Sequence, residues 1–294
     1  HSFPTRRSSD LSGSDISARL LAEKLQKKWG RAVVIENRPG GDSLIALGAY
    51  ASSNDDHVLF YGPAGTFTVH PFQHEKLPYD PAKDLQAIAS VSYTTLAVAV
   101  PTELGINSLA ELVVRAKQNP GVLNAAAAAG LSELFWDGFV RREGLAIPKV
   151  PYRNIVDGTV DLSSNRLQVM FTALPMIKPV AETGKVKILA ITSDKRVSSD
   201  PDVPTSAESG FPTFAIAGLV GLVGPSTMPI ELRRRIGADI LEVGSDPAFT
   251  ERLLATGQEP NLAGADAFAA EIGRQTAAIA VIADLLGMAR KLKQ

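Results

Sequence analysis

The sequence NAAAAAGLSELFWDGFVRREG, at Asn124–Gly144, carries three local signals in succession. It predicts a short strand, then a turn of small residues at 127–130, then a helix that begins at Leu131–Ser132. Alanine and glycine leave room for a ligand to approach the backbone of such a turn. The free N–H groups and partial positive charge at the start of a helix favour an anion. We therefore expect this turn to bind an acidic group.

Two other stretches have the same design. Gly13–Asp15 precedes a helical pattern, and Gly62–Thr66 follows a strand-like run. We interpret the three loops as surrounding one small molecule that bears a carboxylate. The alternative, that each loop is an ordinary connection between a strand and a helix, stays open at this point.

Composition limits the function classes. The chain has 294 residues, of which 45% are hydrophobic and 21% charged, which is a normal globular balance. The net charge of −1 gives no basic field for nucleic acid, so we expect no nucleic-acid partner. Cysteine is absent, which excludes disulfides and cysteine-based metal sites or catalysis. No apolar run reaches the roughly 18 residues of a membrane span.

Strand and helix patterns alternate along most of the chain. Val186–Ile191 is almost continuously apolar, as a parallel strand covered on both faces would be. Ser108 followed by Glu111 is a capping box, which predicts the start of a helix. Such alternation indicates an α/β fold with largely parallel sheets.

The first residues differ from the rest of the chain. HSFPTRRSSDL, residues 1–11, matches the translation of a common sequencing-library adapter and shows no apolar periodicity. We expect it to be an artefact and leave it out of the fold. An α/β unit normally has a strand before the helix at Asp15–Trp29, so we expect that N-terminal strand, and any export signal, to be missing.

Eight phrases, taken together, resemble one family. In order along the chain they are GSDISARLLAEKL, VIENRPGG, KLPYDPAKDL, VPYRNIVDGTVDL, LQVMF, KILAITSDKR, DVPTSAESGFP and GLVGLVGP. They resemble the Bug family, the periplasmic solute-binding proteins of tripartite tricarboxylate transporters. Their order and spacing, from about Gly13 to about Gly287, make the resemblance specific although each phrase alone is weak.

The resemblance implies a two-lobed periplasmic-binding-protein fold of the Venus flytrap type, with the ligand in the cleft and closure on binding. Lobe one would combine residues 12–99 and 225–294, and lobe two would be residues 100–217. Hinge strands would lie at 96–100 and 218–224. A periplasmic monomer that passes its carboxylate to membrane permease subunits is implied, with no catalytic residue, cofactor or metal.

The family's ligand contacts fall on three regions of this chain. The corresponding residues are Gly13, Ser14, Asp15, Ala64, Gly65, Thr66, Thr68, Ala128, Gly130, Ser132, Thr172 and Ala173, with Arg153 as a further candidate. The family commonly has a hydroxyl-rich Ser-Ala-Gly-x-Gly-Thr/Ser turn where this chain has Ala127–Ser132, and many members have Asp at the position of Thr172. Both departures make the site less polar, so we expect a more apolar monocarboxylate.

Other residues have two interpretations. Arg153 would hold a carboxylate bidentately or form a surface ion pair. Trp136 would pack in the core or line the cleft. His70 and His74 have the spacing of a helical zinc pair, but Pro71 argues against a helix, so we expect a surface or loop role.

Two other functions stay open. The first is a sensory module that presents its ligand to a signalling partner, which sequence does not separate from transport. The second is an α/β hydrolase or decarboxylase using Asp15 and a histidine. The sequence contains no G-x-S-x-G motif and no convincing acid–base pair, which disfavours an enzyme.

Overall fold

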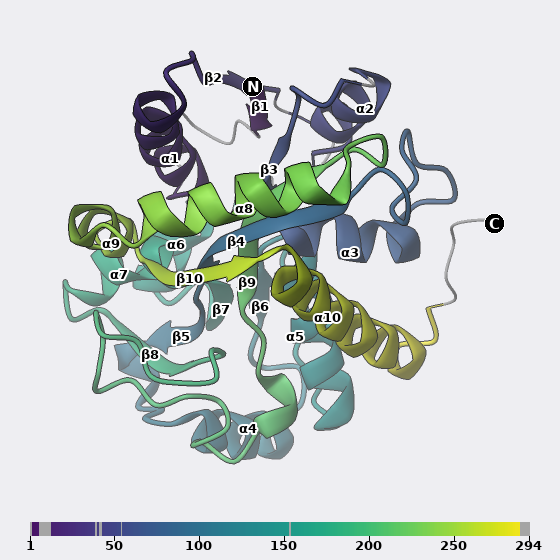
Figure 1. Cartoon of the computed structure of the whole chain (residues 1–294). Helices are drawn as coiled ribbons and strands as arrows, with labels where there is room; N and C mark the ends of the chain where they lie inside the picture. Colours follow the sequence, from purple (N-terminus) through teal and green to yellow (C-terminus); the bar gives the residue numbers. More distant parts are fainter. Residues whose placement is uncertain are drawn as a thin grey trace. The chain divides into compact units, whose positions relative to one another are not determined.

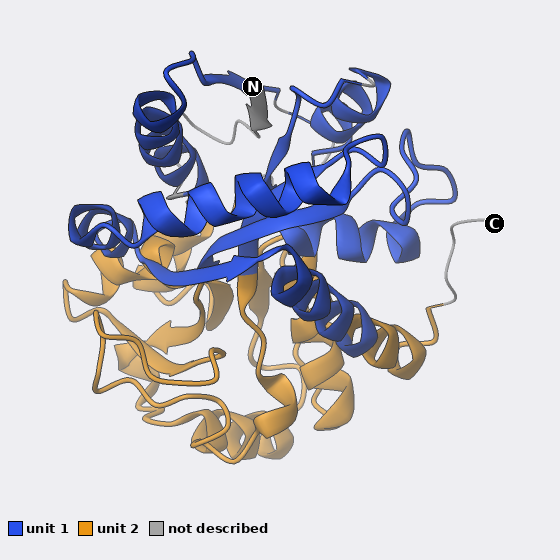
Figure 2. Ribbon diagram, viewed as in Figure 1, with its two compact units in different colours: residues 1–93, 219–278, 289–294 blue, residues 94–218, 279–288 orange. Residues whose placement is uncertain are grey.

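The chain folds into two compact units (Figure 2). The computed structural model describes residues 2–5, 13–38, 40, 43–53, 55–152 and 154–288. Of these, unit 1 contains the residues up to Tyr93 and Leu219–Ala278, and unit 2 contains Thr94–Gly218 and Ile279–Met288. The last segment differs from expectation, which kept residues 225–294 together. Helix α10 (Ala265–Leu285) thus contributes residues to both units.

Unit 1 is built on a four-stranded sheet in the order β10-β4-β9-β3 (Figure 1). The strands of unit 1, including two outside this sheet, are β1 (Ser2–Thr5), β2 (Val34–Asn37), β3 (Phe60–Pro63), β4 (Gln86–Thr94), β9 (Gly218–Gly224) and β10 (Gln258–Gly264). Its helices are α1 (Gly13–Trp29), α2 (Leu44–Ser53), α3 (Ala64–Gln73), α8 (Ile230–Gly244), α9 (Pro247–Leu254) and the larger part of α10.

Strand β9 shows how the sheet of unit 1 is covered. Every residue of β9 is buried, and its side chains alternate between two apolar clusters. Val220 and Leu222 belong to a cluster with α1, α8 and α9, whereas Leu219 and Val223 belong to a cluster with α2, α3 and α10. Helices therefore pack on both faces of the sheet, which explains the continuous run GLVGLVG.

Unit 2 is built on a second four-stranded sheet in the order β6-β7-β5-β8. Its strands are β5 (Leu96–Pro101), β6 (Ala125–Ala127), β7 (Val169–Ala173) and β8 (Val186–Ile191). Its helices are α4 (Leu109–Gln118), α5 (Leu131–Arg142), α6 (Asp157–Ser163), α7 (Leu174–Ala181) and the short 3-10 turns η2 (Thr102–Leu104) and η3 (Pro212–Phe214). Both predicted hinge segments are strands, and the predicted α/β class is confirmed.

The prediction of largely parallel sheets is wrong. Strand β5 runs antiparallel to both of its neighbours, β7 and β8, and β3 runs antiparallel to β9. Only β6–β7 and β1–β2 are parallel among the pairs whose register is established in the described part of the chain. A continuously apolar strand shows that both faces are covered, but it carries no information about direction.

Residues 1–11 were expected to contribute nothing, and this is wrong for Ser2–Thr5. These residues form β1, which pairs in parallel with β2 in the register Ser2–Val34 to Thr5–Asn37. Proline at position 4 argued against a strand, yet proline is tolerated where its missing N–H is not needed by the ladder.

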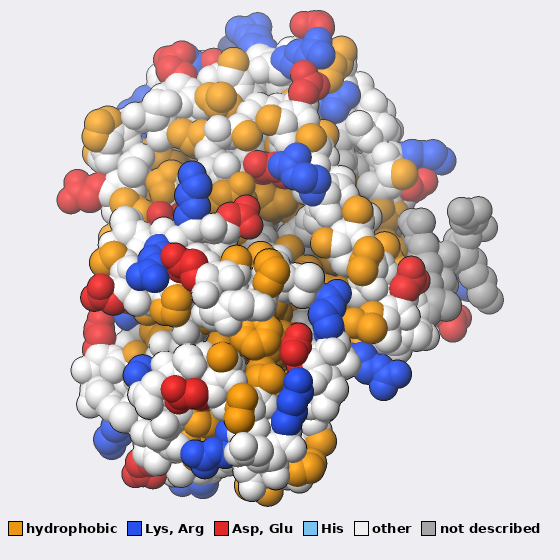
Figure 3. Space-filling view, turned by 90° about the horizontal axis from the view of Figure 1, so that it is seen from below, with side chains coloured by type: hydrophobic (Ala, Val, Ile, Leu, Met, Phe, Trp, Pro, Cys, Tyr) orange, Lys and Arg blue, Asp and Glu red, His pale blue; other side chains and the backbone are white. Residues whose placement is uncertain are grey.

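The face that Figure 3 shows has no large patch of a single charge. Acidic and basic side chains alternate there with apolar ones. Within the residues that the structure describes, none of the helices is both long and apolar enough to cross a membrane.

Candidate functional site

The first predicted loop lies at the start of α1 and is organised by Asp15. Asp15 is 2% exposed. Arg19 donates to the Asp15 carboxylate from Nε at 2.9 Å and from Nη2 at 3.2 Å, and Asn37 donates from Nδ2 at 2.9 Å. Since Asn37 ends β2, the carboxylate joins the first turn of α1 to β2. Asp15 thus acts as an anchor for the loop rather than as an exposed acid.

A second bond joins this loop to the next one. The Oγ of Ser17 and the hydroxyl of Tyr61 are 2.7 Å apart, and both residues are buried. Burial raises the pKa of Tyr61 above its ordinary value, so its hydroxyl stays protonated. Tyr61 lies in β3, shortly before α3 begins. The bond therefore joins α1, which begins at Gly13, to β3, which leads into α3 at Ala64.

The start of α3 lacks a side-chain cap. Its N-cap residue is Pro63, whose side chain accepts no hydrogen bond, so the first amides of the helix lack that usual partner. Thr66 is 7% exposed and Thr68 is 5% exposed. The hydroxyl of Thr68 lies 3.0 Å from the carbonyl of Ala64, inside the helix. The Thr68 hydroxyl is therefore already bonded within α3.

The histidine pair differs from expectation. His70 and His74 do lie at the end of α3, because Pro71 is tolerated inside this helix. His70 is fully buried, its Nδ1 lies 2.7 Å from the Tyr79 hydroxyl, and its ring lies 5.3 Å from that of His74. The predicted surface or loop role is thus wrong for His70. No cluster of three potential metal ligands occurs in the described part of the chain.

The turn between β6 and α5 in unit 2 has the predicted form. Strand β6 ends at Ala127, and α5 begins at Leu131 after Gly130, whose φ of 86° suits glycine and which provides no side-chain cap. Glu133 and Leu134 donate their amides to the carbonyls of Ala128 and Gly130. The amides of Leu131 and Ser132 occupy the first two positions of α5, where a helix offers no internal acceptor.

The end of β7 lies beside this turn. Strands β6 and β7 are parallel, with Ala127 opposite Phe171, and the amide of Ala128 donates to the Phe171 carbonyl at 3.2 Å. The carboxyl ends of parallel strands meet at one edge of a sheet, which is where ligands bind in α/β proteins. Thr172 and Ala173 therefore lie next to the turn before α5. These predicted positions of unit 2 are brought together.

Thr172 has an unexpected neighbour. It is 1% exposed, and its hydroxyl donates to the sulfur of Met176 at 3.5 Å. Sequence reasoning did not include Met176, although its spacing of four from Thr172 was visible. It also missed Asn37, Ser17 and Tyr61, whose partners lie 22 or 44 residues away, so local pattern gave no signal for them.

Arg153 and Trp136 are the two remaining candidates. Arg153 lies outside the described residues. Trp136 is fully buried, with its ring centroid 5.7 Å from Phe139, 6.1 Å from Phe171 and 6.4 Å from Phe214. This contact set supports the core-packing interpretation of Trp136.

Known proteins are similar to this chain in sequence or in fold. A UPF0065 protein of Bordetella bronchiseptica is 31% identical over 249 residues, covering 84% of this chain and 74% of its own. The solved structure of R. palustris Rpa4515 with adipate is 26% identical and has a TM-score of 0.82, with 98% of this chain and 97% of the other covered. The structure of the periplasmic binding protein BugD is also 26% identical, with a TM-score of 0.77 and coverage of 98% and 96%.

The match to a family model is equally extensive. The model described as "Tripartite tricarboxylate transporter family receptor", TctC, matches residues 17–285. The structural matches confirm the predicted periplasmic-binding-protein fold. The family consists of solute-binding receptors, which removes the hydrolase or decarboxylase alternative. This chain therefore belongs to the TctC family of tripartite tricarboxylate transporter receptors, the family to which the Bug proteins are assigned.

Proposed function

We propose that this receptor captures a small organic carboxylate in the periplasm and delivers it to the membrane permease subunits of a tripartite tricarboxylate-type transporter. The observation that carries the proposal is the start of α5. The amides of Leu131 and Ser132 have no acceptor inside the helix there, and the Ser132 side chain is buried. The end of β7 lies beside them. Amide donors and a hydroxyl suit the oxygens of a carboxylate.

Unit 1 contains a similar set of donors. The start of α3 has no side-chain cap, and Thr66 belongs to its first turn. The Ser17–Tyr61 bond joins α1 to β3, and Asp15 joins α1 to Asn37 of β2. The related Rpa4515 structure with adipate supports a carboxylate as the class of ligand, and the periplasmic description of BugD supports the location.

A binding experiment tests the proposal. Thermal-shift screening against organic acids, adipate included, should find a ligand, and mass spectrometry should recover it unchanged after incubation. Calorimetry on Thr66→Ala and Ser132→Ala should then show weaker binding. A hydrogen bond to a charged group contributes about 1.5–3 kcal/mol, so each loss should be roughly ten- to hundredfold.

Matched controls separate the site from general effects. Thr276→Ala on α10 and Ser163→Ala on α6 each remove an exposed hydroxyl that donates to a carbonyl of its own helix, at Ile272 and at Val160 respectively. Both should leave the affinity unchanged. Equal affinity of all four variants and the wild type would contradict the proposed positions, and conversion of the ligand would contradict a receptor role.

A further inference from the structure

The residue of interest is Met176, the third residue of α7. Its side chain is 40% exposed, although that of Thr172, at the end of β7, is 1% exposed. The hydroxyl of Thr172 donates to the Met176 sulfur at 3.5 Å. The thioether therefore covers the hydroxyl at the position where sequence comparison predicted a polar ligand contact.

The start of α7 differs from the start of α5 in the donors it offers. At α7, the Leu174 amide already donates to the Thr95 carbonyl at 2.8 Å, and Pro175 has no amide hydrogen. The first amide that α7 offers is therefore that of Met176 itself. At α5, both Leu131 and Ser132 offer amides. The donors at this edge of the unit 2 sheet are thus concentrated at α5.

The chemistry of the thioether fits an apolar part of a ligand. Sulfur is a weak hydrogen-bond acceptor and has no proton to donate. Methionine is flexible and polarizable, so it packs well against irregular apolar surfaces. Ala127 and Ala128, in the neighbouring turn, are half-buried and likewise offer only methyl groups as side chains. A hydroxyl group placed against these side chains would gain no strong hydrogen-bond partner from them.

We propose that Met176 is a specificity-determining residue that contacts the methylene chain next to the bound carboxylate and selects against a hydroxyl group on that chain. This inference rests on the proposed function. It adds to that function a subsite and a substrate class, straight-chain carboxylates without hydroxyl groups. The carboxylate occupies the start of α5, and the chain lies over Met176.

Calorimetry with a matched pair of probes, adipate and 3-hydroxyadipate, tests the selection. An unpartnered hydroxyl is costly to bury, so the wild type should prefer adipate by roughly tenfold or more. Met176→Gln keeps a similar length but adds a donor and an acceptor, and should reduce that preference by roughly tenfold. Met176→Leu should keep the preference. Val114→Gln, at a 53% exposed position on α4 in the same unit, is the control and should change nothing.

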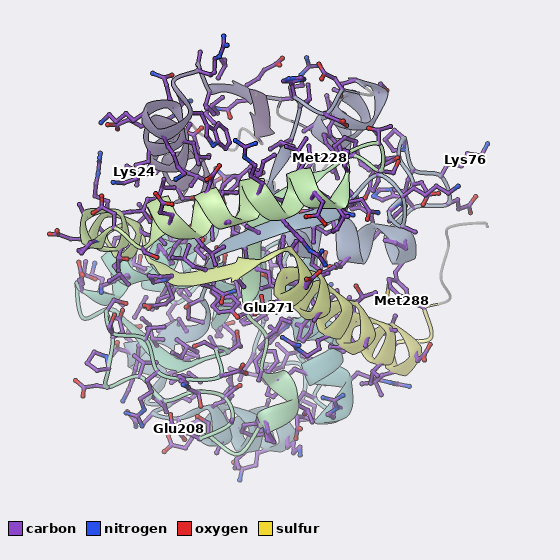
Figure 4. The ribbon with its side chains drawn as sticks, viewed as in Figure 1. Lys24, Lys76, Glu208, Met228, Glu271 and Met288 are labelled. Atoms are coloured by element: carbon purple, nitrogen blue, oxygen red, sulfur yellow. The ribbon has the colours of Figure 1, made fainter. Side chains whose placement is uncertain are left out.

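Peroxide footprinting gives a second test without any substitution. Met176 and the half-buried Met288, which follows the end of α10 (Figure 4), should both be oxidised in the free protein. Met170 and Met228, which are 0% and 2% exposed, should react slowly. Saturation with adipate should slow oxidation of Met176 several-fold and leave that of Met288 unchanged, as measured by peptide mass spectrometry.

The outcomes separate the two proposals. If the folded wild type binds no organic acid of the thermal-shift screen, the proposed function fails and this inference fails with it. If it binds another acid of the screen but neither probe, only this inference fails. If adipate binds but Met176→Gln keeps the wild-type preference, or if bound adipate leaves the oxidation of Met176 unchanged, only this inference fails.

Discussion

Replacing Gly221 by alanine should destabilise unit 1 strongly. Gly221 lies in β9, opposite Gly62 of β3 and beside Phe268 of the apolar cluster formed with α2, α3 and α10. A Cβ atom on Gly221 would lie 2.4 Å from the carbonyl oxygen of Ala89 and 2.6 Å from Cζ of Phe268. Real Cβ contacts essentially never fall below 3.0 Å, so the neighbouring backbone would have to move by about 0.6 Å.

The size of the effect follows from what blocks the methyl group. A flexible side-chain end would give way at small cost, but here a strand carbonyl and a fully buried aromatic ring surround the position. Overpacking of this kind costs roughly 1–3 kcal/mol, and two stiff neighbours favour the upper end. A loss of about 3 kcal/mol corresponds to a fall in Tm of about 6–12 °C for a chain of this size class.

A second glycine provides the control. Gly273 is exposed on α10, and a methyl group added there would have no other atom within 4 Å. Gly273→Ala should raise stability by up to about 1 kcal/mol, because alanine favours a helix more than glycine does. Both variants are compared by urea unfolding followed by circular dichroism. Unfolding midpoints within error of the wild type for Gly221→Ala would refute the reasoning, since the packing of β9 would then be loose.

Three other predictions concern contacts within a unit. Asp15→Ala should destabilise unit 1 by about 1–3 kcal/mol in urea unfolding, because it removes hydrogen bonds to a buried carboxylate. The control, Glu23→Ala, removes an exposed ion pair with Lys27 and should change stability by less than about 1 kcal/mol. Gly138→Ala would put a Cβ 2.7 Å from Cγ2 of Ile282. The double variant Gly138→Ala with Ile282→Ala should therefore lose less stability than the sum of the losses in the two single variants, and additive losses would contradict this packing. The Tyr152 hydroxyl and the Arg166 guanidinium hold the pKa of Asp161 below its ordinary value of 3.8. A carboxyl with a lowered pKa stabilises the fold above its unfolded pKa and loses that contribution as pH falls through the folded pKa. The difference in Tm between the wild type and Asp161→Asn should therefore shrink as pH is lowered below about 4, and a constant difference down to about pH 3 would contradict it.

Local patterns in the sequence were sufficient for much of the fold. The helix start predicted at Ser108 and Glu111 is present, and the Glu111 amide donates to the Ser108 Oγ at 3.1 Å as in a capping box. The Glu111 carboxylate accepts at 2.7 Å from the amide of Asn107, one residue before the N-cap that a capping box would use. The predicted turn before α5 also has its small residues and its glycine at positive φ. These features depend on residues within about four positions of each other, so periodicity and residue type are enough to predict them.

The tertiary structure alone determined which segments meet. The Asp15–Asn37, Ser17–Tyr61 and Ala128–Phe171 bonds join residues far apart in the chain, and the direction of β5 against β7 and β8 depends on the path of the whole unit. Local propensity carries no information about such partners, because a buried hydroxyl or carboxylate requires a hydrogen bond but does not specify which residue provides it. The family resemblance gave Thr172 as a ligand contact, and only the structure shows that its hydroxyl donates to Met176.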